Sequence, residues 1–153
     1  MPRVVRVLVV VSSLLLGVWA GAASAWDASR ESQQAAMVRA VNDARTSHGL
    51  RPLRREPRLA RSARAYARWM LRVDYFGHVD RIRTSARFRV LGETIAWHTG
   101  RRARVRGTLR RWLRSPPHRA LILSRRFRWI GAGLARGRMH GRPSTTWVLH
   151  LGG

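Results

Sequence analysis

The sequence has no cysteine and no lysine among its 153 residues. Without cysteine the chain can form no disulfide bond, no thiolate metal site, no thiol nucleophile and no cysteine-linked lipid anchor. A chain of this length can bury about two thirds of its unfolded surface, so one core can hold the fold without disulfide bonds. Acidic residues are also scarce: seven Asp and Glu stand against 31 basic residues, which gives a formal net charge of +24.

All of the basic residues are arginine, and this charge has two interpretations. One is a cationic surface that binds nucleic acid or an anionic envelope polymer. The other is a GC-rich genome that encodes arginine wherever an exposed positive charge is tolerated, and the absence of lysine favours this origin for the choice of arginine. In both cases the chain will associate with polyanions at low salt, and added salt will screen that association. We expect any binding of nucleic acid to be non-specific.

The N-terminal residues have the features of an export signal. Arg3 and Arg6 precede an apolar run over residues 7–18, and small residues follow at 23–25, which is the pattern that signal peptidase recognises. The run is shorter than the about 20 residues that a membrane-spanning helix needs. We therefore expect residues 1–25 to be a cleaved signal peptide. An uncleaved N-terminal anchor, with the rest of the chain outside the cell, is the alternative.

Apolar periodicity predicts helices before strands in the remaining chain. We expect helices over about residues 32–48, 57–73 and 103–114, and strands over about residues 127–134 and 145–151 with a turn at 137–143. Pro57 suits the first turn of a helix, and Pro116 and Pro117 should end the third helix. Residues 80–92 are rich in arginine and show no clear pattern. Helices first and strands last, without regular alternation, indicate an α+β domain with α-β-α layers.

Three short clusters each place an ionisable residue at the edge of an apolar segment. These residues are His78, Glu93 and His118. Glu93 is the last acid in the chain and has apolar neighbours, so it needs a partner, because an unpaired buried charge costs several kcal/mol. Two His and one Glu are enough for a metal site with an open water position or for a general acid–base pair. Each residue is also compatible with an ordinary structural role.

Seven short motifs, taken in order, resemble the bacterial branch of the CAP (SCP-like) family over about residues 35–153. The motifs are VNDAR at 41–45, GLRPL at 49–53, LARSA at 59–63, YFGH at 75–78, GETIA at 92–96, Trp112 with SPPHR at 115–119, and IGAG at 130–133. The resemblance implies an α-β-α sandwich with a small central antiparallel sheet. It also implies a shallow cavity lined by two His and two acids, which binds zinc or another divalent metal in some members.

By this resemblance His78 matches the first His of the cavity, Glu93 the first Glu and His118 the second His. These three are therefore the candidate catalytic or metal-binding residues. The second Glu has no counterpart, because Ser115 occupies its position, as it does in many bacterial members. A mechanism that needs two acids would lose one of them here. The segment between His78 and Glu93 is also shorter than is usual in the family.

Other His and Trp residues have weaker claims. His98 lies close to Glu93 in the sequence and is a further candidate ligand, with an exposed His of no function as the alternative. His48, His140 and His150 fit no cluster. Aromatic residues between arginines can stack on bases, but the positions of the tryptophans in helix stripes and strands favour core packing. These tryptophans are Trp69, Trp97, Trp112, Trp129 and Trp147.

We expect residues 26–34 to be a short N-terminal segment and residues 35–153 one secreted, monomeric CAP-type binding domain. Its His/Glu-lined cavity would take a small lipid or sterol-like ligand, or a divalent metal such as zinc. One alternative is a metal-dependent, protease-like hydrolase that uses His78, Glu93 and His118. Another is an electrostatic binder of anionic cell-envelope polymers, which needs no cavity and should lose its affinity as salt rises.

Overall fold

The computed structural model describes residues 14–84 and 88–153, with side chains from residue 29 onward. The chain divides into two units, Met1–Glu31 and Ser32–Gly153. Much of the expected signal sequence lies in residues 1–13, outside the described residues. In the part of the chain that is described, no helix is long and apolar enough to cross a membrane. The fold below is that of the second unit.

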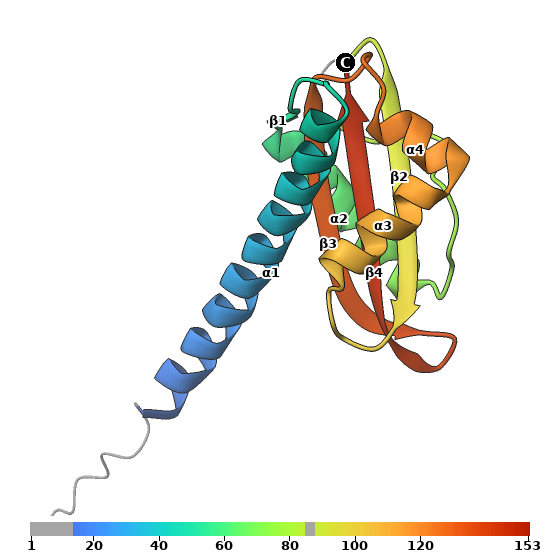
Figure 1. Ribbon diagram of the computed structural model, residues 1–153. Coiled ribbons are helices and arrows are strands. Elements are labelled where there is room, and N and C mark those ends of the chain that lie inside the picture. The colour runs from blue at the N-terminus through green and yellow to red at the C-terminus, as the bar shows by residue number, and fades with distance from the viewer. Residues whose placement is uncertain (1–13, 85–87) are drawn as a thin grey trace, which may run out of the picture. The chain divides into compact units, whose positions relative to one another are not determined.

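The second unit contains helices on both sides of a four-stranded sheet (Figure 1). In chain order the elements are α1 (Leu14–Ser47, of which residues 32–47 belong here), β1 (Arg54–Arg55), α2 (Pro57–Arg72), β2 (Leu91–Thr99), α3 (Val105–Arg114), α4 (Pro116–Ile122), β3 (Trp129–Met139) and β4 (Arg142–Gly152). The strand order is β1-β3-β4-β2. The three long strands are antiparallel as expected, but β1 runs parallel to β3, so the sheet is mixed.

Two apolar cores lie on opposite faces of the sheet and confirm the α-β-α sandwich. On one face α1, α3 and α4 pack on the strands, and on the other face α2 packs alone (Figure 1). Trp112 of α3 and Trp147 of β4 are the largest buried side chains of the first core, with 1% and 0% exposure. The second core is built on small residues of α2, among them Ala63 and Ala67.

Strand β4 is buried on both faces along most of its length. Trp147 and Leu149 belong to the core under α1 and α3, whereas Val148 belongs to the core under α2. Successive side chains of a strand point to opposite faces. His150 therefore points to the α2 side, where a polar side chain has no access to bulk water.

Helix α2 approaches β3 closely because two glycines of that strand face it. A Cβ atom on Gly131 would lie 2.1 Å from the backbone nitrogen of Ala60, and one on Gly133 would lie 2.3 Å from the backbone of Ala63. Backbone-to-backbone contact at this distance excludes every side chain. The close packing sets the position of α2 above the sheet and of the segment that follows it.

The structure differs from the sequence expectations in the helices. Helix α1 begins at Leu14 rather than near residue 32, since residues 20–25 are rich in alanine, the strongest helix former, and contain no proline. Pro116 and Pro117 do follow the end of α3, but they also open α4, where their missing N–H groups are not needed. Helix α2 begins at Pro57 as expected.

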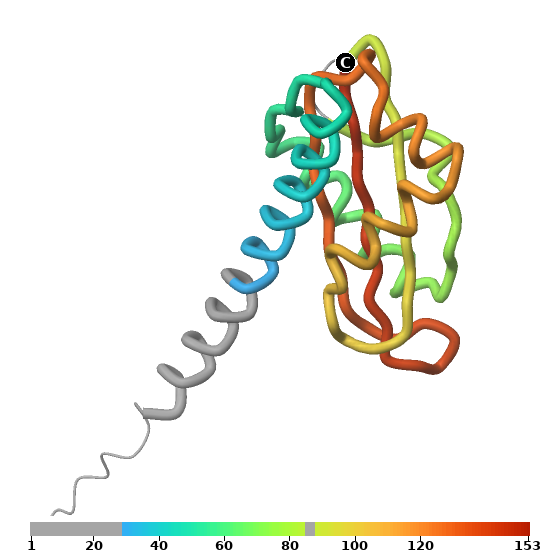
Figure 2. Tube along the Cα trace, in the orientation of Figure 1, coloured from blue at the N-terminus to red at the C-terminus, as the bar shows by residue number. Residues whose placement is uncertain are grey.

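The strands also differ from expectation. Strand β2 was not foreseen, because its residues are buried on both sides and show no alternation of polar and apolar side chains. Strands β3 and β4 are longer than expected, and the turn between them is tight, with positive φ angles of 49° at His140 and 73° at Gly141. Part of the described segment after α2 runs along the outer edge of the sheet beside β2 (Figure 2).

Candidate functional site

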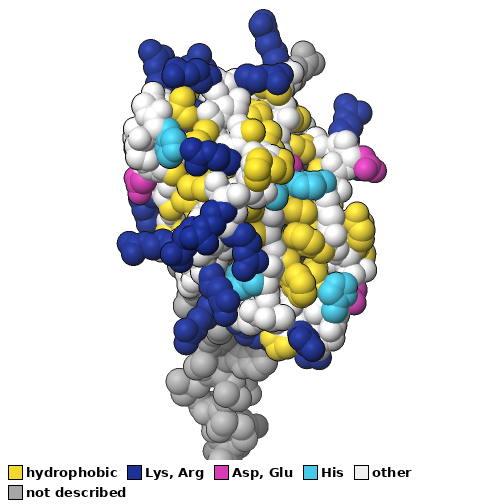
Figure 3. All heavy atoms as spheres, turned by 45° about the vertical axis from the view of Figure 1, so that its right-hand side comes forward, with side chains coloured by type: hydrophobic (Ala, Val, Ile, Leu, Met, Phe, Trp, Pro, Cys, Tyr) yellow, Lys and Arg dark blue, Asp and Glu magenta, His cyan; other side chains and the backbone are white. Residues whose placement is uncertain are grey.

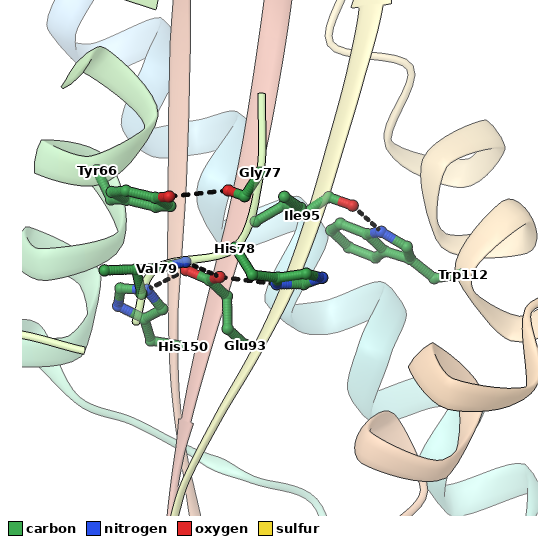
Figure 4. Close-up of polar contacts among 8 residues, drawn as sticks. All are labelled: Tyr66, Gly77, His78, Val79, Glu93, Ile95, Trp112 and His150. Carbon is green, nitrogen blue, oxygen red and sulfur yellow. Dashed lines mark hydrogen bonds and ion pairs between the residues drawn. The ribbon is translucent and has the colours of Figure 1, made fainter. Parts of the chain in front are cut away.

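Glu93 and His150 are cross-strand partners on β2 and β4. The Nε2 atom of His150 lies 3.0 Å from Oε2 of Glu93 (Figure 4). Both side chains are buried, with exposures of 1% for His150 and 6% for Glu93. The strand pairing therefore places a carboxylate and an imidazole side by side beneath α2.

A second histidine reaches the same carboxylate from the segment after α2. The Nδ1 atom of His78 lies 2.8 Å from Oε1 of Glu93, and the backbone N–H of Val79 donates to the same oxygen at 3.1 Å. The hydroxyl of Tyr66 on α2 donates to the carbonyl oxygen of Gly77 at 2.8 Å, which holds this segment against the helix. Figure 4 shows Glu93 between the two histidine rings.

These contacts keep the buried Glu93 ionised. Burial alone would raise the pKa of this carboxyl, but the hydrogen bonds from His150, His78 and the Val79 N–H outweigh it and lower the pKa below its ordinary value. A carboxylate only accepts hydrogen bonds, so Nδ1 of His78 and Nε2 of His150 are the protonated nitrogens. In its neutral form His78 then presents Nε2 as a free acceptor, and its side chain is 58% exposed.

His118 lies near His78 but does not contact Glu93 among the described hydrogen bonds. The centroids of the His78 and His118 rings are 6.3 Å apart. The Nδ1 atom of His118 lies 2.8 Å from the hydroxyl of Ser115, which stands at the C-cap of α3. Burial, and secondarily the charge of His78, lower the pKa of His118. Each of the two histidines is thus oriented by a different group, one by a carboxylate and the other by a neutral hydroxyl.

The residues present do not fit a zinc centre with three protein ligands. Both oxygens of Glu93 are engaged by hydrogen-bond donors, so this carboxylate orients His78 and is not free to bind a metal. His78 and His118 supply two nitrogens, whereas a catalytic zinc site uses three protein ligands and a water. Among the described side chains, those of residues 29–84 and 88–153, no group of three or more His, Asp or Glu residues could hold a metal ion.

The other histidines have contacts of their own. The Nε2 atom of His98 lies 2.7 Å from the carbonyl oxygen of Arg102, and His140 lies against Asp74. His48 contacts the carbonyl oxygen of Ala44. The sequence interpretation missed His150, because residue 150 meets residue 93 only through the register of β2 and β4, and nothing near His150 in the sequence signals that pairing.

A cavity of about 740 Å³ lies beside this cluster, between α2 and the segment after it. Its walls carry Tyr66 and Trp69, whose stacked ring centroids are 5.5 Å apart, and Tyr75, which packs edge-on to Trp69 at 5.8 Å. Trp69 is 37% exposed, so the expectation that it packs in the core was wrong. His78 and the buried His150 also line it, and the remaining polar residues of the lining are Ser62, Arg68, Arg72, Asp80, Arg81 and Arg83.

We name this space, bounded by Tyr66, Trp69, Tyr75, His78 and His150, the aromatic cavity. The Nδ1 atom of His150 is buried and has no hydrogen-bond partner among the described residues. Figure 3 shows hydrophobic and His side chains together on one half of the face that includes β2, with Arg side chains gathered on the other half. The site therefore combines aromatic walls and a buried polar atom with four arginines in its lining.

Solved structures similar to this chain have the same fold. An outer surface protein from Borrelia burgdorferi is 17% identical with a TM-score of 0.64, over 79% of this chain and 92% of that chain. An extracellular protein with an SCP domain from Bacillus anthracis is 20% identical with a TM-score of 0.65, over 80% of this chain and 41% of that chain. A cysteine-rich secretory protein from Staphylococcus aureus is 16% identical with a TM-score of 0.56, over 81% of this chain and 40% of that chain.

The chain spans less than half the length of the Bacillus and Staphylococcus proteins. A search of curated proteins found no match. The family model of the cysteine-rich secretory proteins matches residues 38–151, which cover every strand and α2 to α4 apart from the last residue of β4. The chain therefore belongs to the CAP family, although it contains no cysteine.

Proposed function

We propose that this CAP domain is exported and binds a small ligand with an apolar body, of the lipid or sterol type, in the aromatic cavity. The observation that carries the proposal is the cavity itself, which places Trp69 and Tyr75 at the surface above a buried histidine. Its volume of about 740 Å³ lies within the range of small-molecule sites. Exposed aromatic side chains that face a cavity are costly to leave in water, and an apolar ligand would remove them from it.

The polar atoms of the cavity favour a ligand that also carries one hydrogen-bonding group. The Nδ1 atom of His150 is buried and unpartnered within the described chain, and a buried polar atom of this kind gains free energy when it finds a partner. A hydroxyl group on the ligand can donate to it. The ligand would therefore insert its polar end toward His150 and lay its apolar body against Trp69.

Export is supported by the N-terminal sequence. Arg3, Arg6, the apolar run over 7–18 and the small residues at 23–25 form a signal-peptide pattern. The similar Bacillus structure is described as an extracellular protein. N-terminal sequencing of the protein from the culture medium tests this part, because a mature chain that begins at Trp26 requires cleavage after residue 25.

The binding proposal is tested by titrating the purified chain with a fluorescent sterol and, separately, with a fluorescent fatty acid. Trp69→Ala should weaken binding at least tenfold, since it removes the largest wall of the cavity. Phe76→Ala is the matched control, because Phe76 is similarly exposed at 39% but does not line the cavity. Equal affinity of the wild type and Trp69→Ala, or no binding of either probe, would contradict the proposal.

A divalent metal between His78 and His118 is the alternative that uses neighbouring residues. The 6.3 Å between the ring centroids allows both rings to face one ion, with Ser115 and Glu93 orienting the rings. Two nitrogens are a weak donor set, so we expect binding of zinc weaker than at a three-ligand site. Zinc titration of the wild type and the His78→Ala/His118→Ala double variant measures it, and the hydrolase interpretation requires tight binding that the double variant loses.

A further inference from the structure

A second cavity, of about 360 Å³, lies between α3 and the end of β2. Its arginine side chains are all exposed and come from α3 and the residue before it. The charged and potentially charged residues of its lining are His98, Arg104, Arg110, Arg111 and Arg114. We call this space the α3 arginine groove.

The arginines of the groove follow the helix repeat. Arg104, Arg111 and Arg114 are separated by seven and three residues, which places them on one side of a helix with 3.6 residues per turn. All three side chains are exposed, so they form a row of positive charges along the solvent-facing part of α3. A row of this kind matches a linear ligand better than a single small anion.

Among the described side chains, no acid neutralises the positive charge of the groove. No acid follows Glu93 in the sequence, so α3 has no acidic neighbour at helical spacing. None of the four arginines forms an ion pair with an acid among the side chains of residues 29–84 and 88–153. The effect on His98 is consistent with this: burial first, and then the charges of Arg104 and Arg111, lower the pKa of that histidine.

The start of α3 adds backbone donors to the same groove. Arg104 is the N-cap residue, with a φ of 48°, and its side chain makes no capping hydrogen bond. The first turn has no acidic residue and includes Gly107, which lines the groove without a side chain. The N–H groups of a helix's first turn and the positive end of its dipole favour phosphate oxygens.

We propose that the α3 arginine groove binds a linear polymer of phosphate groups that carries no bases. The guanidinium group of arginine matches the geometry of phosphate and binds it in a bidentate manner. Single-stranded nucleic acids are bound by basic grooves combined with exposed aromatic stacking platforms. Among the described side chains the exposed aromatic residues are Trp69, Tyr75 and Phe76, all at α2 or the segment after it. Trp97 lines the groove but is partly buried and packs against the core beneath α2, and the one aromatic residue of α3, Trp112, is buried.

A second cluster of arginines provides the matched control. A cavity near the start of β1 is lined by Arg51, Arg125 and Arg128, among other residues. Arg51 precedes β1, whereas Arg125 and Arg128 lie in the loop between α4 and β3, so the three form no row along one element. Of the two other arginines in its lining, Arg54 lies over the ring of Trp129. Arg45 is buried and donates to backbone carbonyl oxygens, so its side chain is already engaged.

The experiment measures binding of inorganic polyphosphate to the full chain at a series of salt concentrations. The test variant is Arg104→Gln/Arg111→Gln/Arg114→Gln, and the control is Arg51→Gln/Arg125→Gln/Arg128→Gln, which loses the same net charge. We expect the test variant to lower the slope of log affinity against log salt by about 2, since each phosphate contact on a flexible chain contributes about 0.7. The control should keep the slope of the wild type.

Each other outcome overturns the proposal. Equal losses in the two variants mean that the whole molecular charge binds the polymer and that α3 has no special part. An unchanged slope in the test variant removes the groove as the site. Tighter binding of single-stranded DNA with the same number of phosphates, lost in Trp69→Ala, would show a nucleic-acid surface instead. Circular dichroism of both variants verifies that they are folded, as expected for exposed side chains.

Discussion

The Nε2 atom of His150 and the Oε2 atom of Glu93 are 3.0 Å apart across two neighbouring strands. This contact gives the carboxylate of Glu93 a hydrogen-bond partner inside the protein, where it is largely shielded from bulk water. Glu93 accepts from two imidazoles and one backbone N–H, and these bonds favour the ionised form of the buried carboxyl. In the described chain, the polar centre of the fold and the inner end of the aromatic cavity are therefore the same group of residues.

Replacement of His150 tests this relationship. His150→Leu removes one of the donors to Glu93 and leaves its carboxylate buried and less satisfied, so we expect a loss of about 1–3 kcal/mol in the free energy of unfolding. Urea denaturation measures it. His48→Leu is the control, since His48 is exposed and its loss should change stability by no more than about 0.5 kcal/mol. Equal losses in the free energy of unfolding for the two variants would show that the Glu93–His150 contact does not stabilise the fold.

The lowered pKa of Glu93 predicts a dependence of stability on pH. A carboxyl whose folded pKa lies below its unfolded value stabilises the fold above the unfolded value, 4.5 for Glu, and this stabilisation is lost as the pH falls through the folded value. Glu93→Gln removes the charge at every pH. The wild type should therefore be more stable than Glu93→Gln at pH 7, and the difference should shrink as the pH falls below 4.5.

Unfolding curves of both proteins between pH 7 and pH 3 measure this difference, because the other acids titrate in both proteins and cancel. A difference that stays constant through the acidic range would show that Glu93 is not the titrating group. A difference that grows on acidification would contradict the direction of the pKa shift itself.

The layers of the fold could be predicted from the sequence, because helix periodicity and proline positions are local signals. Helix α2 shows this best, since Pro57 and its apolar stripe define both its start and its buried face. Strand β2 could not be predicted in this way. Both of its faces are covered, so the alternation that identifies a half-exposed strand is missing.

The site residues that belong to short motifs could be predicted from the sequence. The residue that joins the site only through the register of the sheet could not. His78 and Glu93 were identified from short motifs, and the structure brings them to 2.8 Å. His118 was identified in the same way and lies near His78, but not on Glu93. His150 required the pairing of β2 with β4, which is a non-local property. The same holds for the exposed Trp69, whose place depends on the segment that folds back beside α2.

Gly131 should tolerate no side chain. A Cβ atom at this position would lie 2.1 Å from the backbone of Ala60 on α2, and neither backbone can move without separating the helix from the sheet. We expect Gly131→Ala to cost about 1–3 kcal/mol or more, as overpacking does. Gly107→Ala is the control, because its nearest neighbour would be 4.0 Å away and alanine favours a helix by up to about 1 kcal/mol. Thermal unfolding of the two variants should shift in opposite directions, and a stable Gly131→Ala would contradict the close packing of α2.

Arg45 differs from the many exposed arginines of the chain, because it is buried and has a structural role. Its side chain is 2% exposed and donates to the carbonyl oxygens of Arg51, Ile122 and Ser124 at 3.1, 2.6 and 3.0 Å. These bonds join the end of α1 to the loop before β1 and to the end of α4. Burial lowers the pKa of Arg45, but the carbonyl oxygens supply the partners that a buried cation needs.

Arg45→Met keeps much of the volume and removes every donor, so three carbonyl oxygens lose their partner. We expect a loss of about 3 kcal/mol or more in the free energy of unfolding, since each unsatisfied buried acceptor costs about 1–3 kcal/mol. Arg39→Met, on the exposed face of the same helix, should change stability by no more than about 0.5 kcal/mol. Arg45→Lys should fall between them, because one ammonium group cannot reach all three oxygens. If Arg45→Met and Arg39→Met unfold at the same urea concentration, the hydrogen bonds of Arg45 do not stabilise the fold. Arg45 would then be an arginine without a structural role, like the exposed ones.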